Sequence, residues 1–403
     1  MEQPFPVLTD LEIRWQEEEI DERYADITVV SDSFLGRSVP RLQHLNFSRF
    51  PFPGLPGLLL SATDLICLYL DDIPFGGYFT PEEMVNCLSA LTNLEILWLG
   101  FESTGRLYQQ GQLAHPIRPV LPLLKDFKFK GASLYLEILV APIVSPLLNS
   151  LEIILFRNPE LDSPQLLQFV SRTPNVNPPV VAHVDFSAES VSVTFPGALP
   201  RKLILEVLCT PAHSQLSSLA QVCNSSYPQI LIPAVEHLCF SDTVEPQQDS
   251  EDDVEDDQWL EVLRPFTAVK NLYLSRNFVP RIADTLEVFG ETAPEVLPAL
   301  QVLHLEPHSY VAAQVAIEQF VSARRLANQH IAIHWGTYEE GSEVDGLSVV
   351  DDSSMVDDSS GFRFSSGLYF SSASSLVACS PVLNYSPVPD DSSVLDDSSV
   401  PED

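Results

Sequence analysis

The amino-acid sequence predicts an α/β fold, a horseshoe-type solenoid in which strand–helix units stack to give a parallel inner sheet and outer helices. Three observations lead to this fold class: a short apolar pattern recurs along the chain, helix signals lie between its copies, and both stop near residue 336. Each unit has an open apolar face and needs neighbours to complete a core. We therefore divide the chain into a repeat domain, residues 1–336, and a disordered Asp/Ser-rich tail, residues 337–403.

The recurring pattern has the form L-x-x-L-x-L, in which other apolar residues also occupy the L positions. This pattern is typical of the strand segment of a leucine-rich repeat. Within each of two groups of copies, the central apolar residues of neighbouring copies are 23 to 34 residues apart. Each interval therefore has room for one strand and one helix. The nine copies cover residues 6–13, 40–47, 62–70, 91–99, 122–129, 146–153, 233–240, 267–274 and 298–305.

One interval between copies is much longer, because 87 residues separate Leu151 from Leu238. That length can hold two degenerate repeats, and the strand-like segments 180–186 and 203–208 are predicted to fill it. The alternating segment 330–335 predicts a final strand.

Helix signals lie between the predicted strands, and the clearest is at residues 80–91. Thr80 is followed by Pro81, and Glu83 lies three residues after the threonine, which is the arrangement of a capping box with Pro at the first helical position. Segments 163–173, 258–263 and 312–323 are also predicted to be helices. A strand followed by a helix, many times over, is the unit expected of a solenoid.

The charge of the chain is concentrated in three segments. With 56 acidic and 21 basic side chains the formal net charge is −35, and residues 10–26, 242–261 and 337–403 carry 29 of these excess negative charges. Blocks of like charge stay solvated and rarely pack. We therefore predict a disordered acidic loop at 243–257 in addition to the disordered tail. A chain without a basic footprint is not expected to bind nucleic acid or an anionic membrane surface.

The sequence predicts a cytoplasmic or nuclear location. The amino terminus has no basic and apolar leader, and no apolar run approaches the ~18 residues that span a bilayer. The six cysteines lie at irregular separations without a Cys-x-x-Cys pair. Such spacing favours free thiols in a reducing compartment over a disulfide framework.

Five motifs occur in a fixed order along residues 1–335. They are GLPGLLLSATDL at 54–65, PEEMVNCLSAL at 81–91, DSPQL at 162–166, QLSSLAQVC at 215–223 and LRPFTAVKNLYL at 263–274. Together they resemble a large group of fungal F-box proteins with carboxy-terminal leucine-rich repeats. The resemblance implies a protein–protein interaction module, similar to the substrate-recognition part of an F-box subunit of a cullin-type ubiquitin ligase. In such proteins the F-box itself binds the ligase adaptor.

No F-box fits ahead of the first repeat, which begins near residue 6. The ligase adaptor is therefore expected as a partner only of a longer form of the chain. One internal segment, 199–208 followed by 216–223, is similar to an F-box, which opens with Leu-Pro and continues with apolar helix positions. The same segment also fits a strand and a helix of the repeat domain. A ligase-independent scaffold or inhibitor is the alternative function.

The inner face of a solenoid presents the residues that lie between the core leucines, and alternation along each strand identifies them. Tyr69 and Trp98 fall on adjacent repeats and are of the residue types enriched at binding hot spots. The alternative is that these rings only cover the sheet. Lys128 and Lys130 predict a small basic patch beside them. The residues predicted to contact a protein substrate or ligand are Asn46, Tyr69, Trp98, Lys128, Lys130, Glu152, Tyr273 and His304.

The sequence contains no recognisable catalytic, cofactor-binding or metal-ligating constellation, so we predict that the protein is not an enzyme. A hydrolase is the least favoured alternative. His304/His308 and His330/His334 are i, i+4 pairs, but a helix is needed to bring two such rings onto one face, and both pairs include strand or turn residues. Four serines have an acid three residues later, either as phosphorylation sites or by chance in a solvated segment: Ser250, Ser354, Ser393 and Ser399.

Overall fold

The computed structural model of the chain describes residues 5–14, 30–31, 33–103, 118–156, 164–174, 176–209, 213–224, 231–242, 256–292, 295–307 and 311–336. All of these belong to the first of two units into which the chain divides, residues 1–340. The predicted tail lies outside the described residues, and so do the four candidate phosphorylation sites and residues 243–255 of the predicted acidic loop.

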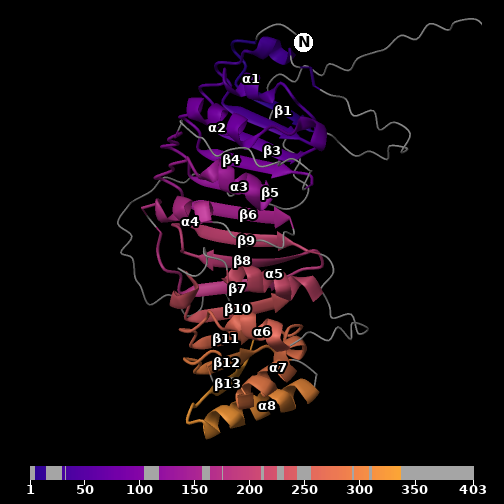
Figure 1. Ribbon diagram of the computed structural model, residues 1–403, viewed down its shortest axis with the longest axis vertical. Helices are drawn as coiled ribbons and strands as arrows, with labels where there is room; N and C mark the ends of the chain where they lie inside the picture. Colours follow the sequence, from indigo (N-terminus) through magenta and orange to yellow (C-terminus); the bar gives the residue numbers. More distant parts are fainter. Residues whose placement is uncertain are drawn as a thin grey trace, which may run out of the picture. The chain divides into compact units, whose positions relative to one another are not determined.

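The strands of the described residues form one thirteen-stranded sheet, drawn in Figure 1. Its strand order is β1-β2-β3-β4-β5-β6-β9-β8-β7-β10-β11-β12-β13. Every one of the nine copies of the apolar pattern overlaps a strand, and so does the predicted final strand. The bounds are β1 Asp10–Arg14, β2 His44–Ser48, β3 Cys67–Ile73, β4 Ile96–Phe101, β5 Asp126–Gly131, β6 Ser150–Phe156, β7 Val181–Phe186, β8 Ser190–Pro196, β9 Lys202–Leu208, β10 His237–Asp242, β11 Asn271–Leu274, β12 Val302–Leu305 and β13 Ala332–Trp335.

The sheet is mostly parallel, so the prediction of an α/β fold with a parallel sheet holds except in its middle. There the long interval contains three strands, β7, β8 and β9, instead of the two predicted. β8 runs antiparallel to both of its neighbours, β7 and β9. In the sheet β9 lies next to β6, although β7 and β8 come between them in the chain. The prediction of a parallel sheet is therefore wrong for β8.

Short turns explain the antiparallel strand. Ser187 N donates to Ser190 O over 2.9 Å between β7 and β8, and Gly197 N donates to Arg201 O over 3.1 Å between β8 and β9. Gly197 has a φ of +73°, which suits glycine. Such connections are too short for the crossover that parallel neighbours require.

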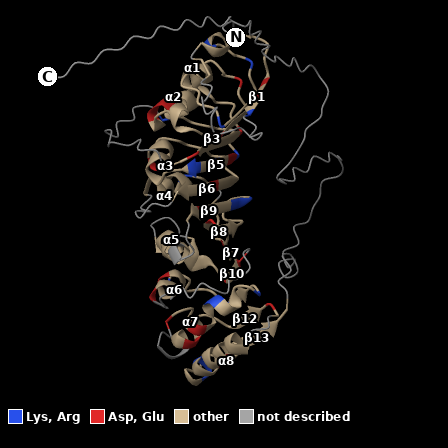
Figure 2. Ribbon diagram, turned by 90° about the vertical axis from the view of Figure 1, so that its right-hand side faces the viewer, with Lys and Arg blue, Asp and Glu red and all other residues tan. Residues whose placement is uncertain are grey.

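Helices α2 to α7 lie on one side of the sheet in Figure 2. The predicted helices at 80–91, 163–173, 258–263 and 312–323 correspond to α2, α4, α6 and α8. α6 begins at Asp256, so the last two residues of the predicted acidic loop are helical; acids are favoured in the first turn by the helix dipole. The bounds are α1 Leu55–Leu59, α2 Pro81–Ala90, α3 Ser133–Val140, α4 Pro164–Ser171, α5 His213–Asn224, α6 Asp256–Leu263, α7 Val279–Thr292 and α8 Val311–Leu326.

Two local predictions can be compared directly with the structure. The capping box of α2 is confirmed: Glu83 N donates to Thr80 Oγ1 over 3.1 Å, and Thr80 N donates to Glu83 Oε2 over 2.8 Å. In the segment that resembles an F-box, residues 202–208 form β9 rather than the helix that an F-box would place there. Its second part, residues 216–223, lies in α5.

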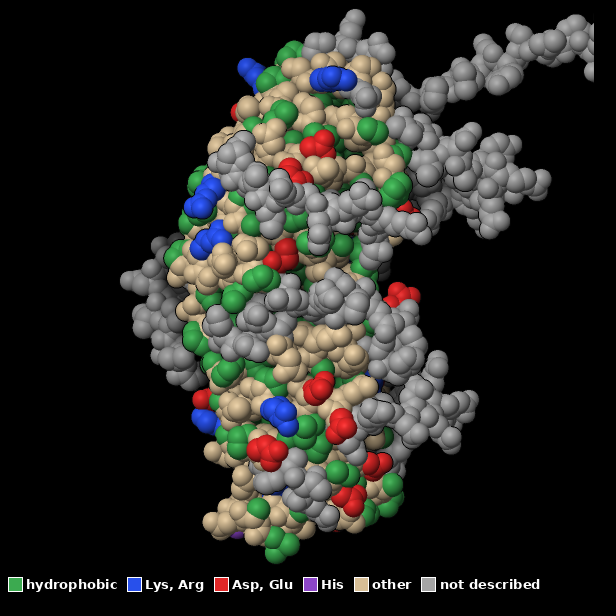
Figure 3. Space-filling model, in the orientation of Figure 1, with side chains coloured by type: hydrophobic (Ala, Val, Ile, Leu, Met, Phe, Trp, Pro, Cys, Tyr) green, Lys and Arg blue, Asp and Glu red, His purple; other side chains and the backbone are tan. Residues whose placement is uncertain are grey.

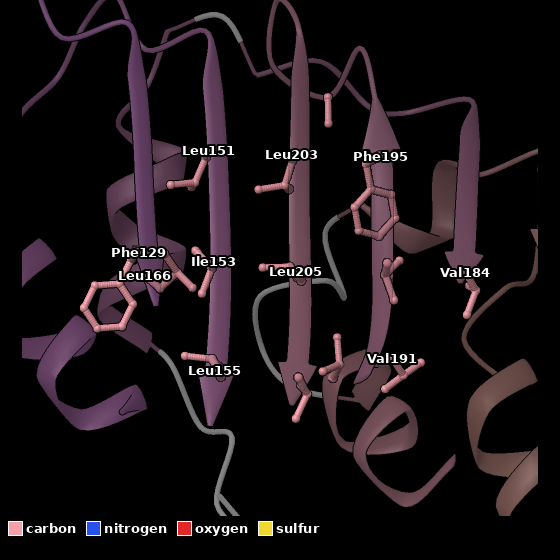
Figure 4. Packing of buried hydrophobic residues seen from close by; sticks show 14 of the residues in the cluster. Phe129, Leu151, Ile153, Leu155, Leu166, Val184, Val191, Phe195, Leu203 and Leu205 are labelled. Atoms are coloured by element: carbon pink, nitrogen blue, oxygen red, sulfur yellow. The ribbon is translucent and has the colours of Figure 1, made fainter. Parts of the chain in front are cut away.

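The hydrophobic core lies between the sheet and the helices. Alternate residues are buried in most of the strands, and Figure 4 shows Leu151, Ile153, Leu203 and Phe195 in neighbouring strands of this layer. Each fully buried side chain of this size contributes about 1.5–3 kcal/mol of hydrophobic stabilisation. The residues between them therefore face the opposite side of the sheet.

Candidate functional site

A row of side chains crosses the whole sheet on the face opposite helices α2 to α7. Its members pair in register from strand to strand, and most are half-buried. We call this the central row. It consists of Glu12, Asn46, Tyr69, Trp98, Lys128, Glu152, Ile204, Thr194, His183, Cys239, Tyr273, His304 and His334.

Seven of the eight predicted contact residues stand in the central row, and the eighth, Lys130, lies two residues further along β5. The predicted contact residues did not include the row members Glu12, Ile204, Thr194, His183, Cys239 and His334. Thr194 lies on β8, a strand that was not predicted. The other five lie in segments already predicted to be strands, so alternation could have found them.

An aromatic pair occupies adjacent strands near the amino-terminal end of the row. The ring centroids of Tyr69 and Trp98 are 6.1 Å apart in an edge-to-face arrangement. The Nζ of Lys128 lies 4.1 Å from the Trp98 ring centroid, within cation–π range. The indole Nε1 of Trp98 is buried and has no hydrogen-bond partner among the described residues.

The small basic patch predicted at Lys128 and Lys130 is neutralised by carboxylates. Lys128 Nζ lies 2.6 Å from Glu152 Oε1, and Lys130 Nζ lies 2.6 Å from Asp72 Oδ1. Arg49 Nε also approaches Asp72, at 3.6 Å. The pattern of one strand did not reveal these partners, because the carboxylates come from other strands. This part of the face consists of matched ion pairs around the aromatic rings.

Asp71 differs from these carboxylates, because no cation lies within ion-pair distance of it among the described residues. It shares the face with Tyr69, two residues earlier on β3. Partial burial and the neighbouring Asp72 carboxylate raise the pKa of Asp71, although Lys130 and Lys128 oppose the shift. Burial also raises the pKa of Tyr69, with Cys67 and Asp126 adding to the effect. The carboxylates of Asp71 and Asp126 therefore lie near the aromatic pair.

A second group of rings lies at the other end of the row. The rings of Tyr273 and His304 stack with centroids 4.2 Å apart and an interplanar angle of 12°. His304 is followed by His334 at 5.2 Å, and His237 lies 6.3 Å from Tyr273. These rings on four adjacent strands add polar ring edges to the same face.

The described residues offer little support for metal or thiol chemistry. Nowhere in the described ranges do three or more His, Cys, Asp or Glu side chains come together in a way that could hold a metal ion. His308 lies outside those ranges. The five described cysteines are buried, and burial raises the pKa of Cys87 and of Cys223 to about 12. Such thiols stay protonated and are poor nucleophiles.

Comparisons of the chain with protein-family models, with curated proteins and with solved structures give no match. No helix in the part of the chain that the structure describes is long and apolar enough to cross a membrane.

Proposed function

We propose that the chain is a protein-recognition module of the leucine-rich-repeat solenoid type, and that it binds a protein partner on the sheet face that carries the central row. The observation that carries this proposal is the in-register row itself, with an aromatic pair and balanced charges at one end. Large aromatic side chains on a face that no described helix covers are typical of binding hot spots. Under this proposal the chain acts by binding, without a catalytic step.

The sequence motifs suggest one biological setting for such a module. They resemble the substrate-selecting repeats of F-box proteins, so the partner would be a protein delivered to a cullin-type ubiquitin ligase. The ligase adaptor would then be recruited by a longer form of the chain. A scaffold or inhibitor without a ligase connection would use the same face, so the identity of co-captured proteins separates the two settings.

Site-specific photocrosslinking in cells would test the use of this face. A photoreactive amino acid would replace Asn46 on the central row in one variant and the exposed Glu82 on α2 in another, as a matched control on the helix side. We expect a discrete crosslinked protein from position 46 and none from position 82. Crosslinks from position 82 alone would overturn the proposed face.

The role of Trp98 would be tested in the same assay. Trp98→Ala should reduce the yield of protein crosslinked through position 46, while the far-ultraviolet circular dichroism and the soluble yield stay unchanged. Loss of folded protein would instead assign Trp98 to the core, and Tyr69→Ala would then serve as the second variant. Mass spectrometry of the crosslinked material would show whether the ligase adaptor accompanies the partner.

A further inference from the structure

The further inference concerns the chemistry of the partner and rests on the proposed function. We infer that the partner inserts a basic side chain, an arginine or a lysine, against the Tyr69–Trp98 ring pair, where the carboxylate of Asp71 neutralises it. The contact is the central anchor of the interface, and three observations lead to it.

The first observation is how the charges around the rings are paired. Glu152 is engaged by Lys128, and Asp72 is engaged by both Lys130 and Arg49. Asp71 has no such partner within ion-pair distance among the described residues, yet it is partly buried. A desolvated carboxylate without a counter-ion is costly in the free protein. A cation brought by a partner would remove that cost on binding.

The second observation is the position of Asp71 relative to the aromatic pair. A methyl group added at Gly100 on β4 would lie 3.2 Å from Asp71 Oδ1 and 3.4 Å from Trp98 Nε1. Both atoms therefore border the same backbone position, and Tyr69 adjoins Trp98 along the row. Rings beside a carboxylate provide cation–π attraction and a charge-assisted hydrogen bond to one guanidinium or ammonium group.

The third observation is electrostatic. The whole chain has a net charge of −35, of which residues 10–26, 242–261 and 337–403 carry 29. Figure 3 shows the helix-bearing face, on which acidic and basic side chains both lie scattered among apolar and uncharged groups. A field of this sign steers cationic partners toward the protein. An acidic partner would meet lysines that are already neutralised by Glu152 and Asp72.

Glu206 provides a matched control for Asp71. It lies on the same sheet face, on β9, and no ion pair joins it to another described residue. Its register neighbours are Ile154 and Ser192 rather than aromatic residues. Replacing either carboxylate by its amide removes one charge and keeps the shape, so the two variants compare a carboxylate beside the aromatic pair with one that has no aromatic neighbour in register.

The experiment is selection of a random twelve-residue peptide library on the immobilised full-length chain, followed by titration of the selected peptides. We expect enrichment of arginine or lysine. Replacing that arginine by citrulline, or Asp71 by Asn, should weaken binding about tenfold, whereas Glu206→Gln should leave it unchanged. Circular dichroism would confirm that both variants are folded.

The outcomes also separate this inference from the proposed function. Acidic or apolar peptides that crosslink through position 46 would leave the binding face intact and overturn the basic anchor. Equal effects of Asp71→Asn and Glu206→Gln would overturn it as well, and so would the absence of any selected peptide. Basic peptides that bind independently of Asp71, Tyr69 and Trp98 would overturn both the anchor and the proposed face.

Discussion

Lys130 on β5 and Asp72 on β3 form an ion pair across the strand that lies between them. The Lys130 Nζ and Asp72 Oδ1 atoms are 2.6 Å apart, and both side chains are mostly shielded from solvent. The intervening strand, β4, has Gly100 at the position paired with Lys130. Without a side chain at Gly100, the lysine can reach over the strand to the carboxylate. Asp72 itself has a φ of +46°, next to the register shift between β3 and β4.

Gly100→Val is expected to destabilise the protein. A Cβ at this position would lie 3.2 Å from Asp71 Oδ1 and 3.4 Å from Trp98 Nε1, so the larger valine must displace them and block the path of Lys130. Overpacking of this kind costs about 1–3 kcal/mol. Chemical denaturation measures the effect. Gly57→Ala in α1 is the control, since nothing lies within 4 Å of its added Cβ. A denaturation midpoint of Gly100→Val equal to that of the wild type would contradict the close packing at Gly100.

The Lys130–Asp72 pair is expected to show a coupling free energy of about 1 kcal/mol, the magnitude typical of partly shielded pairs. A double-mutant cycle with Lys130→Met, Asp72→Asn and the double variant measures it from the free energies of unfolding. Additive effects would show that the pair contributes no coupling. The pair Lys125–Glu95, with atoms 2.7 Å apart, is more exposed than Lys130–Asp72; it serves as a comparison and should give a smaller coupling.

Asp71→Asn is expected to stabilise the folded chain at pH 7. Burial raises the pKa of Asp71 above its ordinary value, so ionised Asp71 is less favourable in the folded state than in the unfolded one. The protonated carboxyl of Asp71 contributes stability to the folded state below its unfolded pKa, and this contribution is lost as the pH rises through its folded pKa. Thermal unfolding of wild type and variant at pH 7 and near pH 3.5 measures this. If Asp71→Asn raised the unfolding temperature more near pH 3.5 than at pH 7, this prediction would be contradicted.

Alkaline pH is expected to destabilise the protein through Cys87 and Cys223. Burial raises the pKa of each from 9.0 to about 12. Each thiol contributes stability below pH 9 that is progressively lost between pH 9 and 12, because the unfolded chain releases its protons first. Between these two pKa values the free energy of unfolding falls by about 1.4 kcal/mol per pH unit for each thiol. The Cys87→Ala/Cys223→Ala variant should show a shallower alkaline decline, and an identical decline would exclude these thiols as its cause.

The sequence was informative where each element makes its own local pattern. The helix start at Thr80 requires only residues within one turn, and the capping box formed as predicted. The central row followed from alternation along single strands, so Tyr69, Trp98 and Tyr273 were found before any strand pairing was known. β8 was missed because its alternating residues, Val191, Val193 and Phe195, lie outside the repeat pattern that guided the search.

Local pattern alone determined which strand residues of this protein share a face of the sheet, because side-chain direction in a strand depends only on its two-residue period. Only the tertiary structure decided which charges meet. Asp72 and Lys130 are 58 residues apart in the chain, and their contact depends on the register of three strands and on a glycine in the middle one. An ion pair depends on distance in space, so one strand's sequence could not distinguish a free basic patch from a neutralised one.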